Sequence, residues 1–221
     1  MSNAGQTITP SRSQRPKGEA SAAPVVMVVD DDIDVRDSLR DLFDSVGIET
    51  ELFASTGEFL DAGIPNRPCC LVLDLRMPGA SGLDLQARLK ELEKRVPVIF
   101  LTGYADVSTS VRAMKAGAVD FLPKPFRDQE LLDAVGEALR IDVERRSGET
   151  AVSEVRKLAD QLTPREVDVL RGVGRGLLNK QIAFELGITE ITVKMHRSSA
   201  GRKLRVVSVA DMVRKIELLK L

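Results

Sequence analysis

The sequence predicts an α/β domain with a parallel sheet, followed by a smaller all-α domain. Two observations support this prediction. Between residues 25 and 145, five short apolar segments alternate with segments whose apolar residues recur at helical spacing. The apolar segments are nearly continuous, as in parallel strands that helices cover on both faces. After residue 158 only helical spacing remains, so the second domain is expected to be all-α.

The expected elements of the first domain follow one another as five βα units. Val25–Val29 is a continuous segment of strand-forming residues, and Asp32–Val46 has helical spacing. Ser55 and Glu58 form a capping box that begins a short helix. The other expected strands are Glu49–Phe53, Cys70–Leu73, Val96–Leu101 and Val119–Leu122, and the other expected helices are Gly82–Lys94, Asp106–Ala116 and Arg127–Arg145.

The chain is expected to divide into four segments. Residues 1–24 are rich in Ser, Gly, Pro, Thr and Gln and lack the apolar core of a signal peptide, which predicts a disordered leader. Residues 25–145 form the α/β domain, and residues 159–221 form the all-α domain. Residues 146–158 begin with a polar run, which predicts a linker.

The composition is that of a soluble globular protein, with 43% hydrophobic and 29% charged residues. No apolar run approaches the roughly 18 residues that span a bilayer, so no membrane partner is expected. The only cysteines, Cys69 and Cys70, are neighbours with no third cysteine, and we expect reduced thiols in a cytoplasmic protein. The single histidine, His196, excludes a His-rich metal site and argues against a Ser-His-Asp hydrolase.

The net charge of −1 conceals an asymmetry along the chain. From Ala159 onward there are 12 Lys and Arg against 7 Asp and Glu, whereas the preceding part has 20 against 26. A basic C-terminal part suggests a nucleic-acid partner for that part only.

Ionisable residues gather at the ends of three expected strands: Asp30, Asp31 and Asp32 after the first, Asp74 after the third, and Lys124 after the fifth. In a doubly wound sheet of order 2-1-3-4-5, the first and third strands are neighbours, so these carboxylates share one pocket. Clustered carboxylates repel one another, and Mg²⁺ would remove that penalty. Asp74 could then accept a phosphoryl group as a nucleophile, while Mg²⁺ and Lys124 neutralise its charge.

Motifs of the first domain resemble the receiver domain of bacterial response regulators, in that family's order and spacing across about Val25–Arg145. The resemblance implies a flavodoxin-like five-stranded sheet, and phosphorylation of Asp74 by a sensor histidine kinase with Mg²⁺ as cofactor. The motifs are Val28-Val-Asp-Asp31, Leu71-Val-Leu-Asp74 followed by Met77-Pro-Gly, Phe100-Leu-Thr-Gly103, and Phe121-Leu-Pro-Lys-Pro125.

The same resemblance implies a role for each residue around Asp74. Asp31 binds Mg²⁺ directly, and Asp30 binds it mainly through water. The backbone carbonyl of Arg76 completes the protein ligands, together with Asp74. The remaining expected roles are a hydrogen bond from Thr102 to the phosphoryl group, an electrostatic contact from Lys124, a switch aromatic at Phe121, and a cis peptide between Lys124 and Pro125.

Two other functions for such a sheet fit the sequence less well. A dinucleotide site needs Gly-x-Gly-x-x-Gly after the first strand, where three aspartates would repel a pyrophosphate. The glycines of Gly172-Val-Gly174-Arg-Gly176 follow a helix and indicate a turn between helices. A haloacid-dehalogenase-type phosphatase would have a second aspartate two residues after Asp74, where Arg76 stands.

Purely structural interpretations also stay open for single residues. Aspartates after strands often form turns or cap helices, and Asp32 or Asp34 is expected to cap the first helix. Taken alone, Thr102 could be a structural hydroxyl and Phe121 a core residue.

The second domain begins with a strong helix signal. Thr163 is the expected N-cap, with Pro at the first helical position and Glu166 closing a capping box. Asn179–Leu186 is a short helix that ends at Gly187, and Thr189 begins a third helix with basic residues. This order is helix-turn-helix geometry, in which the second helix of the pair enters the major groove of DNA.

Three motifs resemble the LuxR-type module of the NarL/FixJ class, over about Leu162–Leu219. They are Leu162-Thr-Pro-Arg-Glu, Asn179-Lys-Gln-Ile-Ala and Ile191-Thr-Val-Lys-Met-His-Arg. The resemblance implies that the last helix, around Val209–Leu219, supports a dimer. It also implies DNA contacts, from Lys194, Met195 and Ser198 to base edges and from Lys180, Thr192 and Arg197 toward the backbone. Arg202 and Lys203 are also available outward. His196 is either a packing residue or a contact.

The second domain departs from the family pattern at three positions. Leu178 stands where Ser or Thr usually caps a helix, and Arg205 replaces the usual closing glycine. Gly201 lies inside the recognition helix and should weaken it by roughly 0.5–1 kcal/mol relative to Ala. These departures leave the end of the helix and its DNA register open.

The sequence therefore predicts a cytoplasmic transcription regulator, and not an enzyme beyond the gain and loss of the phosphoryl group on Asp74. Phosphorylation is expected to produce a homodimer through the fourth helix, fifth strand and fifth helix. The expected partners are the histidine kinase and double-stranded promoter DNA, with RNA polymerase as a further candidate. Two alternatives stay open: a DNA-binding protein whose receiver works without phosphorylation, and a metal-dependent phosphatase with an accessory helical domain.

Overall fold

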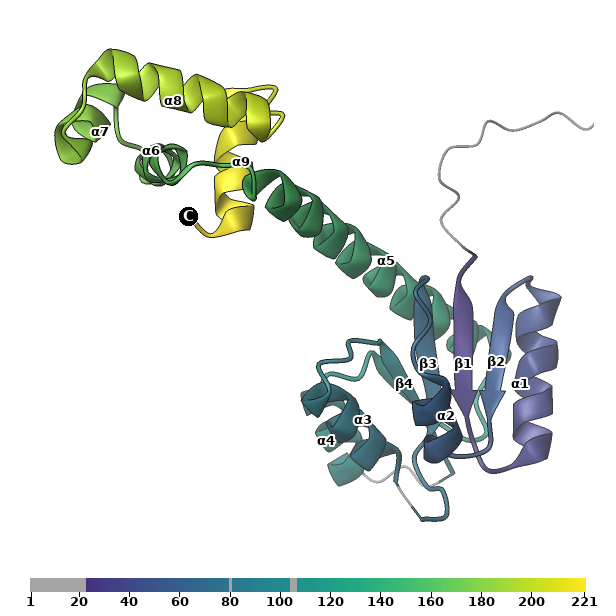
Figure 1. The fold of residues 1–221 in the computed structure, drawn as a ribbon. Coiled ribbons are helices and arrows are strands. Elements are labelled where there is room, and N and C mark those ends of the chain that lie inside the picture. The colour runs from purple at the N-terminus through teal and green to yellow at the C-terminus, as the bar shows by residue number, and fades with distance from the viewer. Residues whose placement is uncertain (1–22, 80, 104–106) are drawn as a thin grey trace, which may run out of the picture. The chain divides into compact units, whose positions relative to one another are not determined.

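The computed structural model describes residues 23–79, 81–103 and 107–221 (Figure 1), so nearly all of the expected leader and the expected helix start at Asp106 lie outside the described residues. The chain divides into two compact units, of which the first ends at Leu139 and the second spans Arg140–Leu221. The first unit contains, in chain order, β1 (Val25–Val29), α1 (Ile33–Ser45), β2 (Glu49–Phe53), α2 (Thr56–Ala62), β3 (Cys69–Asp74), α3 (Gly82–Glu91), β4 (Val98–Thr102), α4 (Val107–Lys115), β5 (Asp120–Pro123) and the start of α5 (Asp128–Ala159).

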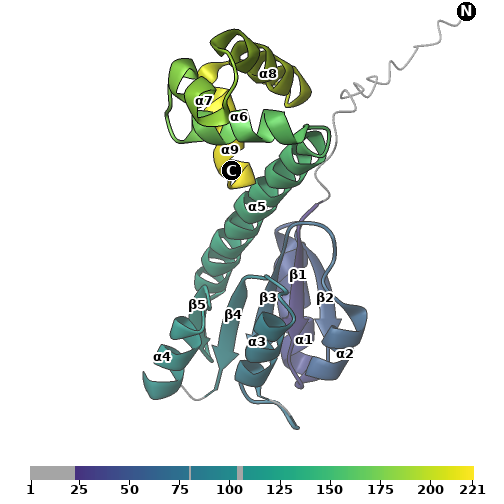
Figure 2. The same cartoon turned by 60° about the vertical axis from the view of Figure 1, so that its left-hand side comes forward.

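The five strands form one parallel sheet in the order β2-β1-β3-β4-β5, which confirms the predicted α/β fold (Figure 2). Val29 of β1 pairs with Phe53 of β2 on one side and with Leu73 of β3 on the other. Asp74, at the end of β3, pairs with Leu101 of β4. All strands point the same way, so their carboxyl ends meet at one edge of the sheet.

Helices cover both faces of the sheet. On one face, Met27, Leu73 and Phe100 pack in a core with side chains from α2, α3 and α4. On the other face, Val28 and Ile99 pack with side chains from α1 and the first turns of α5. Neighbouring residues of a strand point to opposite faces, so the continuous apolar strands supply both cores.

The fifth helix is longer than the sequence predicted. It ends at Ala159 and not at Arg145, so the residues expected to form a linker from position 146 are helical. Side chains four residues apart stabilise this part, with Arg145 paired to Glu149 at 2.8 Å and Arg146 to Asp142 at 2.6 Å. The polar composition of the residues from position 146 onward therefore reflects their exposure and not a loss of helical structure. The division of the chain into its predicted segments stays a prediction.

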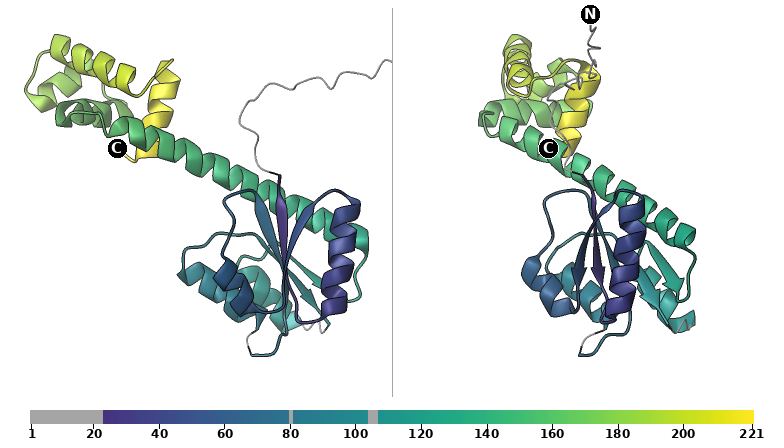
Figure 3. Two further views of the ribbon diagram at one scale, coloured as in Figure 1. Left: turned by 45° about the vertical axis from the view of Figure 1, so that its right-hand side comes forward. Right: turned by 90° about the vertical axis from the view of Figure 1, so that its right-hand side faces the viewer.

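The second unit contains four further helices: α6 (Pro164–Gly174), α7 (Asn179–Leu186), α8 (Glu190–Lys203) and α9 (Val209–Leu219) (Figure 3). Leu170, Ile182, Val193 and Ile216, one from each helix, lie in a common core. The capping box that the sequence predicted at the start of α6 is present. In the part of the chain that the structure describes, no helix combines the length and apolar composition needed to cross a membrane.

Candidate functional site

Three charged side chains meet at the carboxyl edge of the sheet. Asp30 follows β1, Asp74 ends β3, and Lys124 follows β5. The Nζ atom of Lys124 lies 2.6 Å from Oδ2 of Asp30 and 2.9 Å from Oδ1 of Asp74. The aspartate side chains are 2% and 8% exposed and the lysine side chain 22%, so the cluster is open to solvent mainly on the lysine side.

Backbone amides hold the other carboxylate oxygens. The amide of Asp32 donates to Oδ1 of Asp30 at 3.0 Å, and the amide of Arg76 donates to Oδ2 of Asp74 at 2.8 Å. The Nη1 atom of Arg36 donates to the carbonyl oxygen of Asp30 at 2.5 Å. Each aspartate is therefore fixed by a turn that its own side chain closes, a feature that aspartates after strands share.

Asp30 and Lys124, two of the three titratable groups of this cluster, respond to burial in different ways. Burial raises the pKa of Asp30, because the hydrogen bond from Lys124 only partly offsets the loss of hydration. Burial alone would lower the pKa of Lys124, but its hydrogen bonds to Asp30 and Asp74 outweigh this effect and raise that pKa. The cluster therefore keeps its lysine charged while it disfavours a second buried negative charge.

The predicted Mg²⁺ ligands are only partly assembled. Asp30 and Asp74 are joined through Lys124, whereas Asp31 is exposed. Among the described residues, no three His, Cys, Asp or Glu side chains form a ready ligand group. The donors nevertheless suit Mg²⁺, because carboxylate oxygens are hard ligands and two carboxylates around one ammonium leave negative charge uncompensated.

The structure places the other predicted residues of the receiver site close to the same edge. Thr102, at the end of β4, is buried and pairs with Pro123, and its carbonyl accepts from the amide of Lys124 at 2.6 Å. Phe121 is half-buried, with its ring centroid 6.5 Å from that of Phe100. The expected cis peptide between Lys124 and Pro125 is present.

In the second unit, α8 has one face open to solvent. Lys194, Met195, Ser198 and Arg202 are exposed, and they recur at intervals of three or four residues, which places them on one side of the helix. Met195, a large apolar side chain on this face, is 67% exposed. This exposed face contains two of the basic residues that the sequence predicts to contact DNA, Lys194 and Arg202.

Other predicted DNA contacts surround this face. Lys180 is exposed on α7. Arg197 is half-buried, with Nη1 3.4 Å from the side-chain oxygen of Asn179 at the start of α7. The hydroxyl of Thr192 lies 2.9 Å from that of the N-cap Thr189. Arg197 therefore helps to fix α8 against α7, whereas Thr192 takes part in the cap at the start of α8.

Lys203 differs from the prediction that it is available outward. Its Nζ atom lies 2.7 Å from Oε2 of Glu166, a residue of α6 that is only 3% exposed. Burial alone would raise the pKa of Glu166, but hydrogen bonds from Lys203, Ser199 and Thr163 outweigh it and lower the pKa to about 2. Lys203 therefore forms an ion pair within the unit in this structure, and its contact with DNA stays a prediction.

Sequence reasoning missed Glu166 and Arg36 as residues that support the two candidate sites. The capping position of Glu166 was visible in the sequence, but its ion pair with Lys203 was not, because the two residues are 37 positions apart. No sequence signal pointed to the contact of Arg36 with the backbone of Asp30.

Two protein families match the chain: the response regulator receiver domain over residues 26–136 and the luxR family of bacterial regulatory proteins over residues 160–216. Nodulation protein W of Bradyrhizobium diazoefficiens is 50% identical over 208 residues, which cover 94% of this chain and 92% of the relative. The transcriptional regulatory protein FixJ of Azorhizobium caulinodans is 43% identical over 189 residues, which cover 86% and 90%. Of solved structures, the response regulator StyR matches with a TM-score of 0.77 at 48% identity, over 89% of this chain and 99% of that chain. Full-length FixJ from B. japonicum matches with a TM-score of 0.54 at 37% identity, over 89% and 97%.

Proposed function

Because the chain belongs to the two-component response regulators of the NarL/FixJ class, with a receiver and a LuxR-type DNA-binding domain, we propose that phosphorylation of Asp74 controls its binding to promoter DNA. The observation that supports this proposal most directly is the contact of one lysine, Lys124, with both Asp30 and Asp74. A pair of buried carboxylates that share one ammonium is suited to receive a phosphoryl group and a cation.

In the proposed transfer, a carboxylate oxygen of Asp74 attacks the phosphorus of a phosphohistidine on the kinase. The new P–O bond forms as the P–N bond breaks, and the leaving imidazole takes up a proton. Mg²⁺ bound by Asp30, Asp31, Asp74 and the carbonyl of Arg76 would neutralise charge on the phosphoryl oxygens. Lys124 then exchanges its contact with the Asp74 carboxylate for one with a phosphoryl oxygen.

The proposed switch starts at Thr102. Its hydroxyl turns toward the new phosphoryl group, and Phe121 moves into the space that this side chain leaves. The change reaches α4, where Val111 and Met114 are large apolar side chains with 44% and 46% exposure. These residues support the proposal that the phosphorylated receiver forms a homodimer through α4, β5 and α5.

We propose that α8 enters the major groove of promoter DNA, with Lys194, Met195 and Ser198 at base edges. Lys180, Thr192 and Arg197 would contact the DNA backbone, and Arg202 and Lys203 are further candidates for DNA contacts. The protein would act in the cytoplasm, where promoter DNA and RNA polymerase are its partners.

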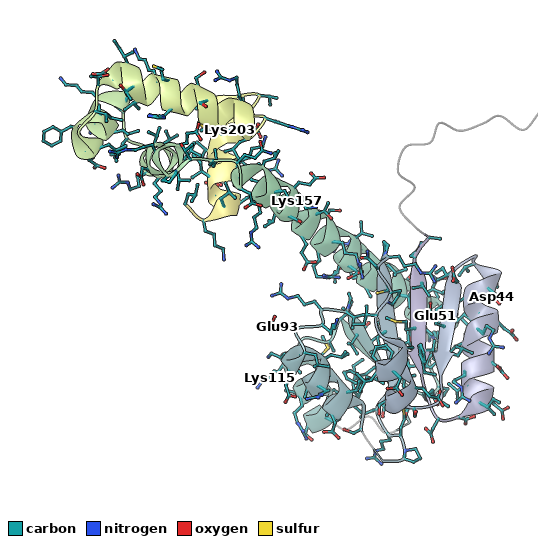
Figure 4. The ribbon with its side chains drawn as sticks, viewed as in Figure 1. Asp44, Glu51, Glu93, Lys115, Lys157 and Lys203 are labelled. Carbon is teal, nitrogen blue, oxygen red and sulfur yellow. The ribbon has the colours of Figure 1, made fainter. Side chains whose placement is uncertain are left out.

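The substitution Asp74→Asn tests this function. We expect it to abolish phosphoryl incorporation from acetyl phosphate with Mg²⁺, as measured by intact mass. It should also abolish the increase in DNA retention in a gel shift. Asp44→Asn is the matched control, because Asp44 is exposed on α1 and its side chain points away from the sheet (Figure 4).

The same experiment separates the alternatives. If Asp74→Asn still shows activated DNA binding, the receiver works without phosphorylation. If the wild-type chain hydrolyses p-nitrophenyl phosphate catalytically and retains no DNA at low salt, it is a phosphatase.

A further inference from the structure

The C-terminal end of α8 contains two features that weaken a helix. The chain leaves the helix through Arg205 at a φ of 52°, in the left-handed region that favours glycine. One turn earlier stands Gly201, which lacks the side chain that favours helical structure. A Cβ atom at this position would lie 3.3 Å from Cε of Met212 on α9, so the glycine gives α9 room to pack against this turn.

Lys215 of α9 holds this same end of the helix. Its Nζ atom donates to the carbonyl oxygens of Leu204 at 3.0 Å and Arg205 at 2.9 Å, and it lies 3.0 Å from Oδ2 of Asp211. The side chain of Lys215 is only 16% exposed. A cation near the last carbonyls of a helix also interacts favourably with the helix dipole.

The last two turns of α8 also contain two residues of its exposed face, Ser198 and Arg202. The Nη1 atom of Arg202 lies 3.2 Å from Oγ of Ser198, so these side chains form one unit. Fraying of the end of α8 would displace them from any groove in which the first turns of the helix are seated. The ammonium that opposes fraying belongs to Lys215, which is turned toward the protein.

We propose that Lys215 is a positioning residue for DNA recognition: it fixes the end of α8 in place of the missing glycine at position 205, without touching DNA itself. The inference rests on the proposed recognition of promoter DNA by α8. On this inference, a lysine of α9 determines how well side chains of α8 discriminate between DNA sequences.

The test uses the full chain with acetyl phosphate and Mg²⁺ throughout. A random-sequence duplex pool is first selected on the wild-type chain, and the selected duplex and a scrambled duplex then serve as probes. We expect Lys215→Met to weaken binding of the selected duplex about tenfold and to leave binding of the scrambled duplex nearly unchanged. Lys220→Met is the matched control, because it removes the same charge from an exposed position at the end of α9. It should leave the ratio of the affinities for the selected and the scrambled duplex unchanged.

A second pair of variants separates positioning from charge and from stability. Lys215→Met combined with Arg205→Gly should bind the selected duplex about fivefold more tightly than Lys215→Met combined with Arg205→Ala. The two double variants carry the same charge, but only the one with glycine at position 205 adopts the left-handed conformation without strain. All binding is measured well below the melting temperature of each variant.

Three results would overturn the positioning role. The first is a lower melting temperature of Lys215→Met with unchanged discrimination between the two duplexes. The second is equal binding of the selected duplex by the two double variants, with glycine or alanine at position 205. A wild-type chain that selects no sequence from the pool would refute the proposed DNA recognition itself, and the role of Lys215 with it.

Discussion

Replacing Glu166 by Gln tests whether the buried ion pair with Lys203 stabilises the second unit. Gln keeps the shape of the side chain and can still accept from the amide of Thr163, so the substitution removes mainly the charge. The pKa of Glu166 falls from an ordinary value of 4.5 to about 2. Each pKa unit corresponds to about 1.4 kcal/mol, so the charged carboxylate contributes roughly 3 kcal/mol to the free energy of unfolding.

Solvent near Lys203 reduces this contribution, because the lysine side chain is 30% exposed and retains some hydration without its partner. We therefore expect Glu166→Gln to lower the free energy of unfolding by about 2–3 kcal/mol at neutral pH. A carboxylate whose pKa is lowered by folding stabilises the protein fully above its unfolded pKa. The difference between the two proteins should thus shrink as the pH falls from about 4.5 toward 2.

The measurement is urea unfolding of the full chain at a series of pH values, followed by NMR amide resonances of α6 and α8 so that this unit alone is observed. Glu217→Gln is the control, because Glu217 is exposed on α9 and should change the stability by less than about 0.5 kcal/mol. A loss for Glu166→Gln no larger than that of the control would refute the reasoning. A loss that does not depend on pH between 4.5 and 2 would do the same.

Three further predictions concern glycines and one DNA contact. Gly82→Ala should destabilise the receiver by about 1–3 kcal/mol in chemical unfolding and slow phosphoryl incorporation, because the added Cβ would lie 2.6 Å from the carbonyl oxygen of Asp74. An unchanged midpoint of the unfolding transition would contradict this prediction. Gly136→Ala and Gly148→Ala should each raise the stability by about 0.5–1 kcal/mol, since both lie in α5 with no atom within 4 Å of the added methyl group, and a lower melting temperature would argue against a continuous helix there. Lys194→Met should reduce the slope of log affinity against log salt concentration by about one; an unchanged slope would mean that Lys194 neutralises no phosphate.

The acidic site could be predicted from sequence because topology alone brings its residues together. Asp30, Asp74 and Lys124 each follow a strand, and the carboxyl ends of parallel strands meet at one edge whatever the side-chain packing. The position of Asp31 relative to this cluster depends on a loop conformation that no periodicity encodes. The sequence therefore predicted the members of the cluster better than the contacts between them.

The full length of α5 and the ion pair of Lys203 could not be predicted, for a different physical reason. The polar residues that begin at position 146 gave no apolar periodicity, but ion pairs such as Arg145 to Glu149 stabilise a helix where its side chains are mostly exposed. Lys203 lies near the end of α8, where helical spacing allows the side chain to turn either way. The buried carboxylate of Glu166 decides the direction, and this is a tertiary contact.

Two of the buried charge clusters among the described residues, that of Glu166 and that of Asp30 and Asp74, differ in how well their charges are matched. In the second unit one carboxylate, that of Glu166, meets one ammonium and further hydrogen-bond donors, and its pKa is lowered. In the receiver, Asp30 and Asp74 share the single ammonium of Lys124, and burial raises the pKa of Asp30. A matched cluster gains nothing from another ion, whereas a cluster short of positive charge gains from binding a cation. This difference supports the proposal that the receiver cluster carries the phosphoryl chemistry, whereas the ion pair of Glu166 stabilises the second unit.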